Sequence, residues 1–225
     1  TCTLSCTTGR GISTPRHIFP MRRRGALRVG GSFWLLVVLA VVVSPAMVVA
    51  AVLTAAALHE LGHLAALRHY GVPVRALRLT AFGAALDAPS LVRLSYGREL
   101  AVTLAGVTVN LLAGCFLAGV GLWFRWEWAF VFAGAHLLLM AFNLLPIVPL
   151  DGARALYLAV AFFFGPTAGE RVCAAVSLAG ALAVCALGLD LSLRLQSGWL
   201  FAIAALGLLW GALGQLGLAR GGKSV

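Results

Sequence analysis

Two histidines and a glutamate, His59, Glu60 and His63, are the residues whose types and spacing point most directly to chemistry. They form an H-E-x-x-H pattern at the end of an apolar run in which no residue from Ser32 to Leu58 is charged. On a helix, positions i and i+4 share a face, so both imidazoles can reach one metal ion. Glu60 lies beside them, where it can act on a metal-bound water. The motif predicts a zinc hydrolase site at membrane depth, where ionisable residues are costly and usually functional.

The same three residues also have a purely structural interpretation. The two imidazoles and the carboxylate could satisfy each other's hydrogen bonds between packed helices. A chance match on a surface helix is disfavoured, because residues 55–58 and 64–67 are all Ala or Leu and offer no solvated face.

Asp151 is the candidate for the third protein ligand, which a catalytic zinc ion usually takes from His, Asp or Glu. It lies in an apolar stretch, 143–152, in which Pro146 and Pro149 prevent a regular helix. Irregular backbone at membrane depth is tolerated where it is buried in protein or lines a wet cavity. Asp151 would begin the next helix, where a carboxylate is electrostatically favoured. Alternatively, Asp151 only caps that helix and the prolines form a surface turn.

The composition indicates what kind of protein carries these residues. Of the 225 residues, 61% are hydrophobic and 11% charged, and the mean hydropathy is +0.99, whereas about a quarter of the residues in a soluble domain are charged. This balance predicts a polytopic membrane protein of the all-α class without a sizeable soluble domain. The net charge of +10 comes mostly from arginines between apolar stretches. It therefore favours membrane topology signals and contact with anionic lipid, and argues against nucleic acid as a partner.

The apolar stretches predict six membrane-spanning helices. Residues 32–67 would extend about 54 Å as one helix, which exceeds a bilayer core of about 30 Å, and Ser44-Pro45 is the natural break. Between the second and third spans, the alternating residues 74–79 predict a small β-hairpin at the membrane surface. The six spans are expected at about 32–43, 46–68, 99–122, 129–148, 171–189 and 198–217, with a shorter apolar helix at 152–164.

The positive charges predict the orientation in the cell membrane. With the N-terminus in the cytosol and six crossings, 15 of the 17 Lys and Arg residues fall on cytosolic segments, and only Arg125 and Arg194 fall outside. Both termini are then cytosolic. Residues 1–30 are expected to be a basic, disordered tail, of which 1–20 may lie upstream of the native start. Residues 31–218 would form the membrane domain, and 219–225 a short C-terminal tail.

These two motifs together resemble those of the site-2 protease family of intramembrane zinc metalloproteases. The sequence has H-E-x-x-H at 59–63 in the second span and N-x-x-P-x-x-P-x-D-G at 143–152 after the fourth. The resemblance covers about 31–217 and is closest to the six-span subgroup typified by the sporulation pro-sigma-factor processing peptidase. Residues 105–110 are also similar to the family's Ala-Gly-Pro segment with its trailing asparagine.

The resemblance implies roles for individual residues. His59, His63 and Asp151 would bind one zinc ion per chain, and Glu60 would be the catalytic general base. Three further polar residues would border the substrate cleft, namely Asn110, His136 and Asn143. For His136, a hydrogen bond between packed helices is preferred over a contact in the cleft or with the metal.

The chain departs from the family pattern at four positions, one of which is His136, where the subgroup often has asparagine. Val107 stands where the family has proline, Ala153 replaces a second glycine after the aspartate, and Ala84 replaces a glycine of the hairpin. None of these changes removes a ligand or the base, so proteolytic activity remains the expectation.

The predicted function is hydrolysis of a membrane-embedded or membrane-associated protein near the cytosolic face. Regulation would come from a separate membrane protein partner. The alternative is a non-proteolytic membrane protein, either a metal transporter or an inactive, protease-like scaffold. A transporter should show polar residues along several spans, and an inactive relative should have lost Glu60 or a ligand.

Overall fold

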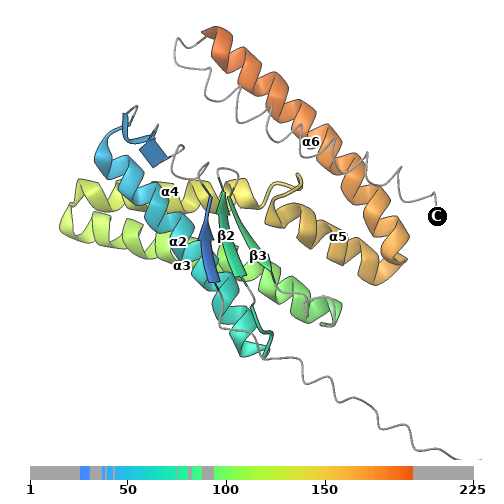
Figure 1. Cartoon of the computed structure of the whole chain (residues 1–225). Coiled ribbons are helices and arrows are strands. Elements are labelled where there is room, and N and C mark those ends of the chain that lie inside the picture. The colour runs from blue at the N-terminus through green and yellow to red at the C-terminus, as the bar shows by residue number, and fades with distance from the viewer. Residues whose placement is uncertain are drawn as a thin grey trace, which may run out of the picture.

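Five helices dominate the computed structural model (Figure 1), and they follow the apolar runs of the sequence. They are α2 (Ala46–His69), α3 (Tyr96–Phe124), α4 (Glu127–Asn143), α5 (Asp151–Phe164) and α6 (Pro166–Arg194). The structure describes residues 26–30, 37–38, 40–42, 44–74, 76–80, 83–87 and 94–194. The first predicted span is described only in part and the sixth not at all, so the count of six stays a prediction.

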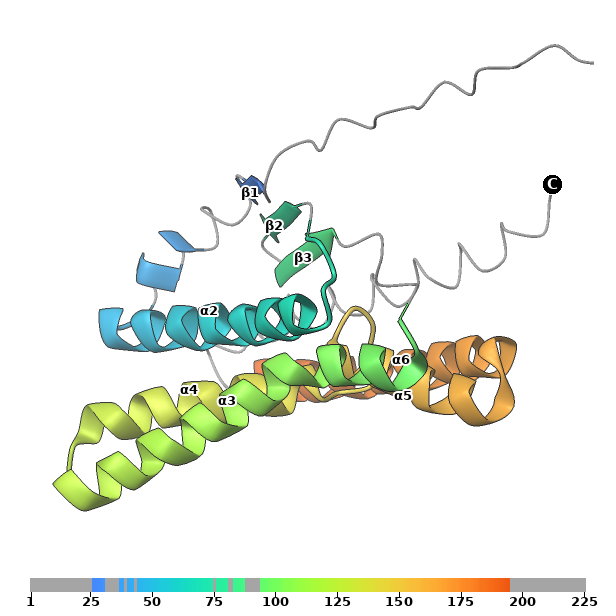
Figure 2. The same cartoon turned by 90° about the horizontal axis from the view of Figure 1, so that it is seen from below.

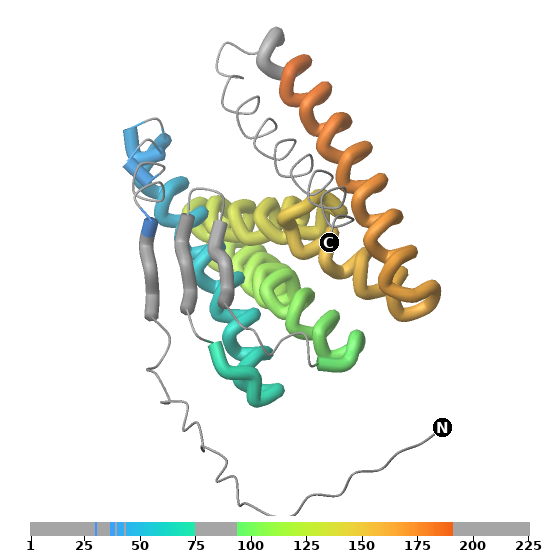
Figure 3. The backbone as a smooth tube through the Cα atoms, turned by 45° about the vertical axis from the view of Figure 1, so that its right-hand side comes forward, coloured from blue at the N-terminus to red at the C-terminus, as the bar shows by residue number. Residues whose placement is uncertain are grey.

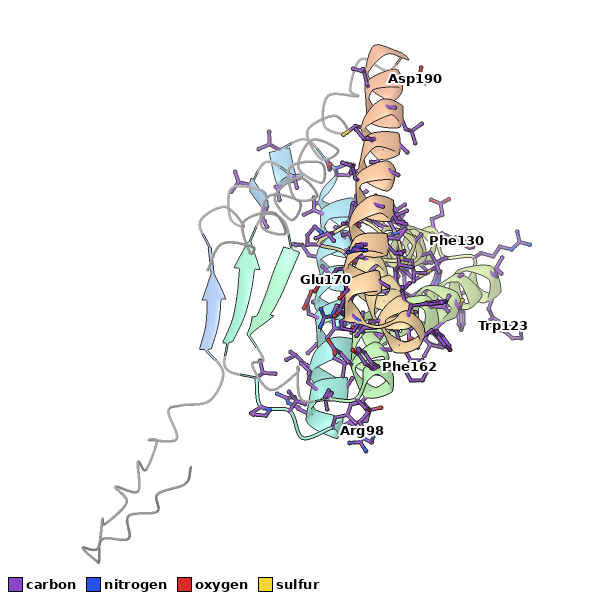
Figure 4. The ribbon with its side chains drawn as sticks, turned by 90° about the vertical axis from the view of Figure 1, so that its right-hand side faces the viewer. Arg98, Trp123, Phe130, Phe162, Glu170 and Asp190 are labelled. Carbon is purple, nitrogen blue, oxygen red and sulfur yellow. The ribbon has the colours of Figure 1, made fainter. Side chains whose placement is uncertain are left out.

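Three of these helices, α2, α3 and residues 166–190 of α6, are long and apolar enough to cross a membrane, and α4 is a shorter apolar helix. At most a third of the most apolar window of each long helix is buried within the protein. Large side chains such as Phe116 and Trp123 are 71% and 83% exposed, and Trp123 projects away from the helices (Figure 4). Apolar surface on this scale suits a lipid environment.

Helices α2, α3 and α4 pack against one another, while α5 packs on α3 and α6 on α5. Glycines allow the close approach that membrane helices favour. A methyl group on Gly62 of α2 would lie 2.8 Å from the Ala105 carbonyl oxygen of α3. Likewise, a methyl group on Gly114 of α3 would lie 2.7 Å from Leu137 of α4. The backbones of α2 and α3 are therefore nearly in contact, a side chain of α4 packs onto the α3 backbone at Gly114, and the three helices lie together in the backbone trace (Figure 3).

A three-stranded sheet lies on the opposite side of α2 from α3 and α4 (Figure 2). Its strands are β1 (Ala26–Val29), β2 (Ala76–Thr80) and β3 (Gly83–Asp87), in the order β1-β2-β3. Strands β2 and β3 pair antiparallel between α2 and α3, where the sequence predicts a hairpin. The location of this hairpin at a membrane surface stays a prediction.

Strand β1 differs from the sequence-based expectation, because residues 26–29 fall within the predicted disordered tail 1–30. They pair in parallel with β2, from Ala26 opposite Ala76 to Val29 opposite Leu79, and the two strands run side by side (Figure 1). The short run Ala-Leu-Arg-Val carries little signal by itself, and its hydrogen-bonding partner lies about fifty residues further along the chain. The rest of the predicted tail lies outside the described residues.

Three helix boundaries lie five residues from the predicted ones, among them the end of α6 at Arg194 and not at 189. Helix α4 ends at Asn143 and not near 148, because Pro146 and Pro149 follow in a loop of turns. Helix α6 begins at Pro166, five residues before the predicted start, since proline is well accommodated at the first helical position. The early end of α4 leaves an irregular segment, 144–150, that leads directly to Asp151.

Candidate metal centre

Helix α2 presents His59 and His63 to the interior of the helix bundle. The two residues are 5% and 7% exposed, and they continue a buried stripe at four-residue spacing that includes Ala51, Ala55 and Leu67. Because i and i+4 lie on one helical face, the imidazoles come together, with ring centroids 4.7 Å apart. The Nε2 atoms of the two rings are 3.1 Å apart.

Asp151, the first residue of α5, brings its carboxylate to this pair from a distant part of the chain. Its Oδ2 atom lies 3.0 Å from His59 Nε2 and 3.2 Å from His63 Nε2. The three side chains form a group able to hold a metal ion. The structure therefore brings together the three residues that the sequence suggests as ligands, the two histidines of α2 and this carboxylate.

A backbone carbonyl fixes the orientation of His63. Its Nδ1 atom lies 2.8 Å from the Val102 carbonyl oxygen of α3. A carbonyl can only accept, so the hydrogen bond assigns the proton of the neutral ring to Nδ1 and leaves a lone pair on Nε2. That lone pair is directed toward His59 and Asp151, as a metal ligand requires.

The spacing and chemistry of these atoms fit zinc. Ligand atoms about 2.0–2.1 Å from a tetrahedral ion lie roughly 3.3 Å from one another, close to the observed separations of 3.0–3.2 Å. Asp151 Oδ2 is buried, and among the described residues only the two imidazoles lie within hydrogen-bond distance of it. Two imidazoles and one carboxylate are a common donor set of catalytic zinc sites, which keep a fourth position open.

Gly106 of α3 provides the space for both rings. A methyl group at this position would lie 2.6 Å from His63 Nε2 and 2.8 Å from His59 Cε1. Gly152 has a similar role beside Asp151, since a methyl group there would overlap the Leu144 backbone. Both glycines belong to the segments that resemble the family motifs. Their contacts could not be derived from the sequence, because they depend on which segments approach each other.

Glu60 completes the arrangement from the same helical turn. Its side chain is half-buried, and its carboxylate is close enough to His59, His63 and Asp151 to interact electrostatically with all three. A carboxylate in this position can accept a proton from a molecule held between the three residues.

The three residues predicted to border a substrate cleft occupy different environments. Asn110 and His136 are fully buried, and His136 Nδ1 lies 3.1 Å from Asn110 Oδ1, which links α3 to α4. Asn143 is half-buried and donates to the Leu139 carbonyl oxygen of its own helix, at 3.0 Å. The described contacts of all three are contacts within the protein, and none includes a ligand of the metal site.

The solved structures include a protein with the same fold. It is described as a site-2 protease from Methanocaldococcus jannaschii and superposes with a TM-score of 0.64 at 23% identity, over 84% of this chain and 89% of that chain. This chain has the site-2 protease fold. No protein-family profile and no curated protein matches the sequence. The likeness establishes the site-2 protease fold and does not single out the sporulation subgroup.

The departures from the site-2 protease pattern fit into this fold without disturbing the metal site. Val107 and Ala153 are 7% and 2% exposed, so both side chains are packed inside the protein. The Ala153 carbonyl oxygen accepts a hydrogen bond from the Cys173 thiol, at 3.3 Å. The fold thus accommodates the side chains of Val107 and Ala153, and the three candidate ligands still lie together.

A cavity of about 570 Å³ lies beside Asp151, between α5 and α6. Its lining is mixed, with Arg154, Tyr157 and Glu170 as polar members. The full lining consists of Val148, Pro149, Leu150, Ala153, Arg154, Tyr157, Glu170, Cys173 and Ala174. In this site-2 protease fold, the segment that carries Asp151 therefore borders open space.

Proposed function

We propose that this protein is an intramembrane zinc metalloprotease of the site-2 protease family. The observation that carries the proposal is the convergence of His59, His63 and Asp151 within 3.2 Å of one another in a bundle of membrane-type helices. The fold shared with a site-2 protease supports it. Among the described residues, no polar group other than the two imidazoles reaches the buried Asp151 Oδ2, as expected for an atom that a metal ion would hold.

The ligands and the base have separate tasks in this proposal. His59, His63 and Asp151 would hold one zinc ion, which when bound polarises a carbonyl group and acidifies water. Glu60 accepts the proton of the attacking water and returns it to the leaving amine. The Val102 carbonyl keeps the His63 ring in the orientation that ligation needs.

The substrate in this proposal is an unwound segment of a membrane-embedded or membrane-associated protein. An extended segment exposes its carbonyl groups, whereas a helix hides them. The cavity beside Asp151 gives such a segment room, and the sheet could add it as a further strand. A separate membrane protein as regulator, and the sporulation subgroup as closest relatives, belong to the same proposal.

Cleavage is proposed to occur near the cytosolic face, with both termini in the cytosol. The support is the distribution of positive charge, with 15 of 17 Lys and Arg residues on segments assigned to that side. His59 and His63 lie in the half of α2 that ends at Arg68, which is one of these positive charges.

Glu60→Gln tests the proposal directly. The amide keeps the shape of the side chain but cannot accept the proton, so cleavage of a membrane-tethered reporter should fall by about 10²–10⁴-fold while zinc stays bound. Glu127→Gln, at an exposed position in the first turn of α4, is the matched control and should behave like wild type.

Two measurements on the purified protein complete this test. Zinc content should be one per chain in wild type and Glu60→Gln, and should be lost in His59→Ala. A Glu60→Gln variant that cleaves at the wild-type rate would exclude Glu60 as the base. A zinc-loaded wild type that cleaves no membrane protein would favour the non-proteolytic alternative.

A further inference from the structure

Asp151 is the ligand whose position depends most on contacts outside its own element. His59 and His63 share one helix, but Asp151 follows an irregular loop, and its carboxylate must be kept within about 3 Å of both imidazoles. We propose that Ser177 of α6 and Glu99 of α3 are positioning residues that hold Asp151 in the metal site. This inference rests on the metal site of the proposed function.

Ser177 fixes the loop that precedes Asp151. It is 2% exposed, and its hydroxyl donates to the Pro146 carbonyl oxygen at 3.2 Å. The Ser177 hydroxyl oxygen in turn accepts a hydrogen bond from the Val148 N–H, also at 3.2 Å. The Ser177 side chain thus serves as hydrogen-bond partner for two backbone groups of the loop, the Val148 N–H and the Pro146 carbonyl. These residues lie three and five positions before Asp151. Without the hydroxyl, two polar groups of a part-buried loop would need new partners.

Glu99 fixes the turn that follows Asp151. Its side chain is buried, and it forms an ion pair with Arg154 of α5. Arg154 is three residues after Asp151, so the two share one side of the first turn of α5. A buried carboxylate that lost this cationic partner would be strongly disfavoured, and the pair therefore ties α5 to α3. Helix α3 also carries Gly106, on which both histidine rings pack.

Asp151 thus lies between two fixed points. Ser177 holds the chain at Val148 and Glu99 holds it at Arg154. Neither residue touches the candidate ligands in the contacts that the structure describes, so both would act on metal binding through the position of Asp151.

The test measures zinc affinity of the full-length protein by competition with a chelator. Ser177→Ala and Glu99→Gln should each weaken binding by about 10–100-fold, as loss of groups that orient a ligand typically does. Ser177→Thr keeps the hydroxyl and should restore most of the affinity. Thr54→Ala removes an exposed hydroxyl bound to its own helix, and Glu127→Gln is the second control. Both controls should bind zinc like wild type.

A second measurement separates positioning from a general loss of stability. In an Asp151→Ala background, Ser177→Ala and Glu99→Gln should have no further effect on zinc affinity, because they act through the missing carboxylate. An equal loss with and without Asp151 would overturn the inference, as would wild-type affinity in both single variants. If Ser177→Ala does not fold, Ser177→Thr and Glu99→Gln decide the question.

The outcomes also distinguish this inference from the proposed function. Wild-type protein that binds zinc but cleaves no substrate would contradict the protease alone. Unchanged affinity in both variants of an active protease would contradict the positioning roles alone. A wild-type chain that binds no zinc would overturn both.

Discussion

Gly106 controls, at the scale of single residues, how closely the two histidine rings can lie to α3. Gly106→Ala places a methyl group 2.6 Å from His63 Nε2, so at least one ring must move. Zinc affinity should fall by about 10–100-fold, because the ligand orientation is lost. Chelator competition on the purified variant measures this change.

Gly119 of the same helix provides the control for this substitution. A methyl group there would meet nothing within 4 Å, and alanine is a better helix former than glycine by about 1 kcal/mol. Gly119→Ala should therefore retain zinc and gain slightly in stability. Equal zinc affinity in Gly106→Ala and Gly119→Ala would show that the rings have another place to pack.

His136 should support the bundle without binding zinc. It lies against Asn110 and both are fully buried, so asparagine at 136 can keep the hydrogen bond, whereas leucine cannot. His136→Asn should retain zinc and most activity, and His136→Leu should lower stability by about 0.6–2 kcal/mol. Zinc content and thermal unfolding of the two variants check this. Loss of stoichiometric zinc in His136→Asn would identify His136 as a ligand.

At the scale of elements, the sequence predicts the helix boundaries that depend on a local pattern of prolines and apolar residues. The break at Ser44-Pro45, the end of the helical run before Pro146 and the helix that begins at Asp151 follow from prolines and apolar runs. Strand β1 and Ser177 depend on partners elsewhere in the chain, about fifty and thirty residues away. Nothing local marks them, so they could be found only once the segments were placed in space.

The cavity between α5 and α6 leads to a prediction about substrate size. Ala174 lines this cavity, whereas its neighbour Ala175 is exposed and does not belong to the lining. Ala174→Trp should fill the cavity and lower kcat/KM for a protein substrate, by up to about 100-fold if the substrate is displaced. Zinc content should not change.

Ala175→Trp adds the same volume at a position outside the cavity and should cleave like wild type. The comparison uses a membrane-tethered reporter and a short peptide in parallel. Equal rates for the two tryptophan variants would show that the substrate does not enter this cavity.

At the scale of the whole molecule, zinc should stabilise the fold, because its ligands come from two helices, α2 and α5, that are far apart in the sequence. An ion held at 100 times its dissociation constant adds about 2.7 kcal/mol. Removing it with a chelator should lower Tm by about 5–10 °C. His59→Ala, which already lacks a ligand, should show no chelator effect. Thermal unfolding in detergent measures the Tm of wild type and of His59→Ala with and without chelator. A wild-type Tm that the chelator does not change would contradict stabilisation of the fold by the metal.

The division of the ligands between α2 and α5 also has a consequence during biosynthesis. A chain inserts from its N-terminus, so α2 enters the membrane before Asp151 has been synthesised. Two imidazoles alone leave the ion one protein ligand short. If the proposed function holds, the nascent chain would be inert toward the proteins around the insertion machinery and would become able to hydrolyse them only after α5 has been synthesised. Separating the ligands along the sequence would then delay activity until after insertion.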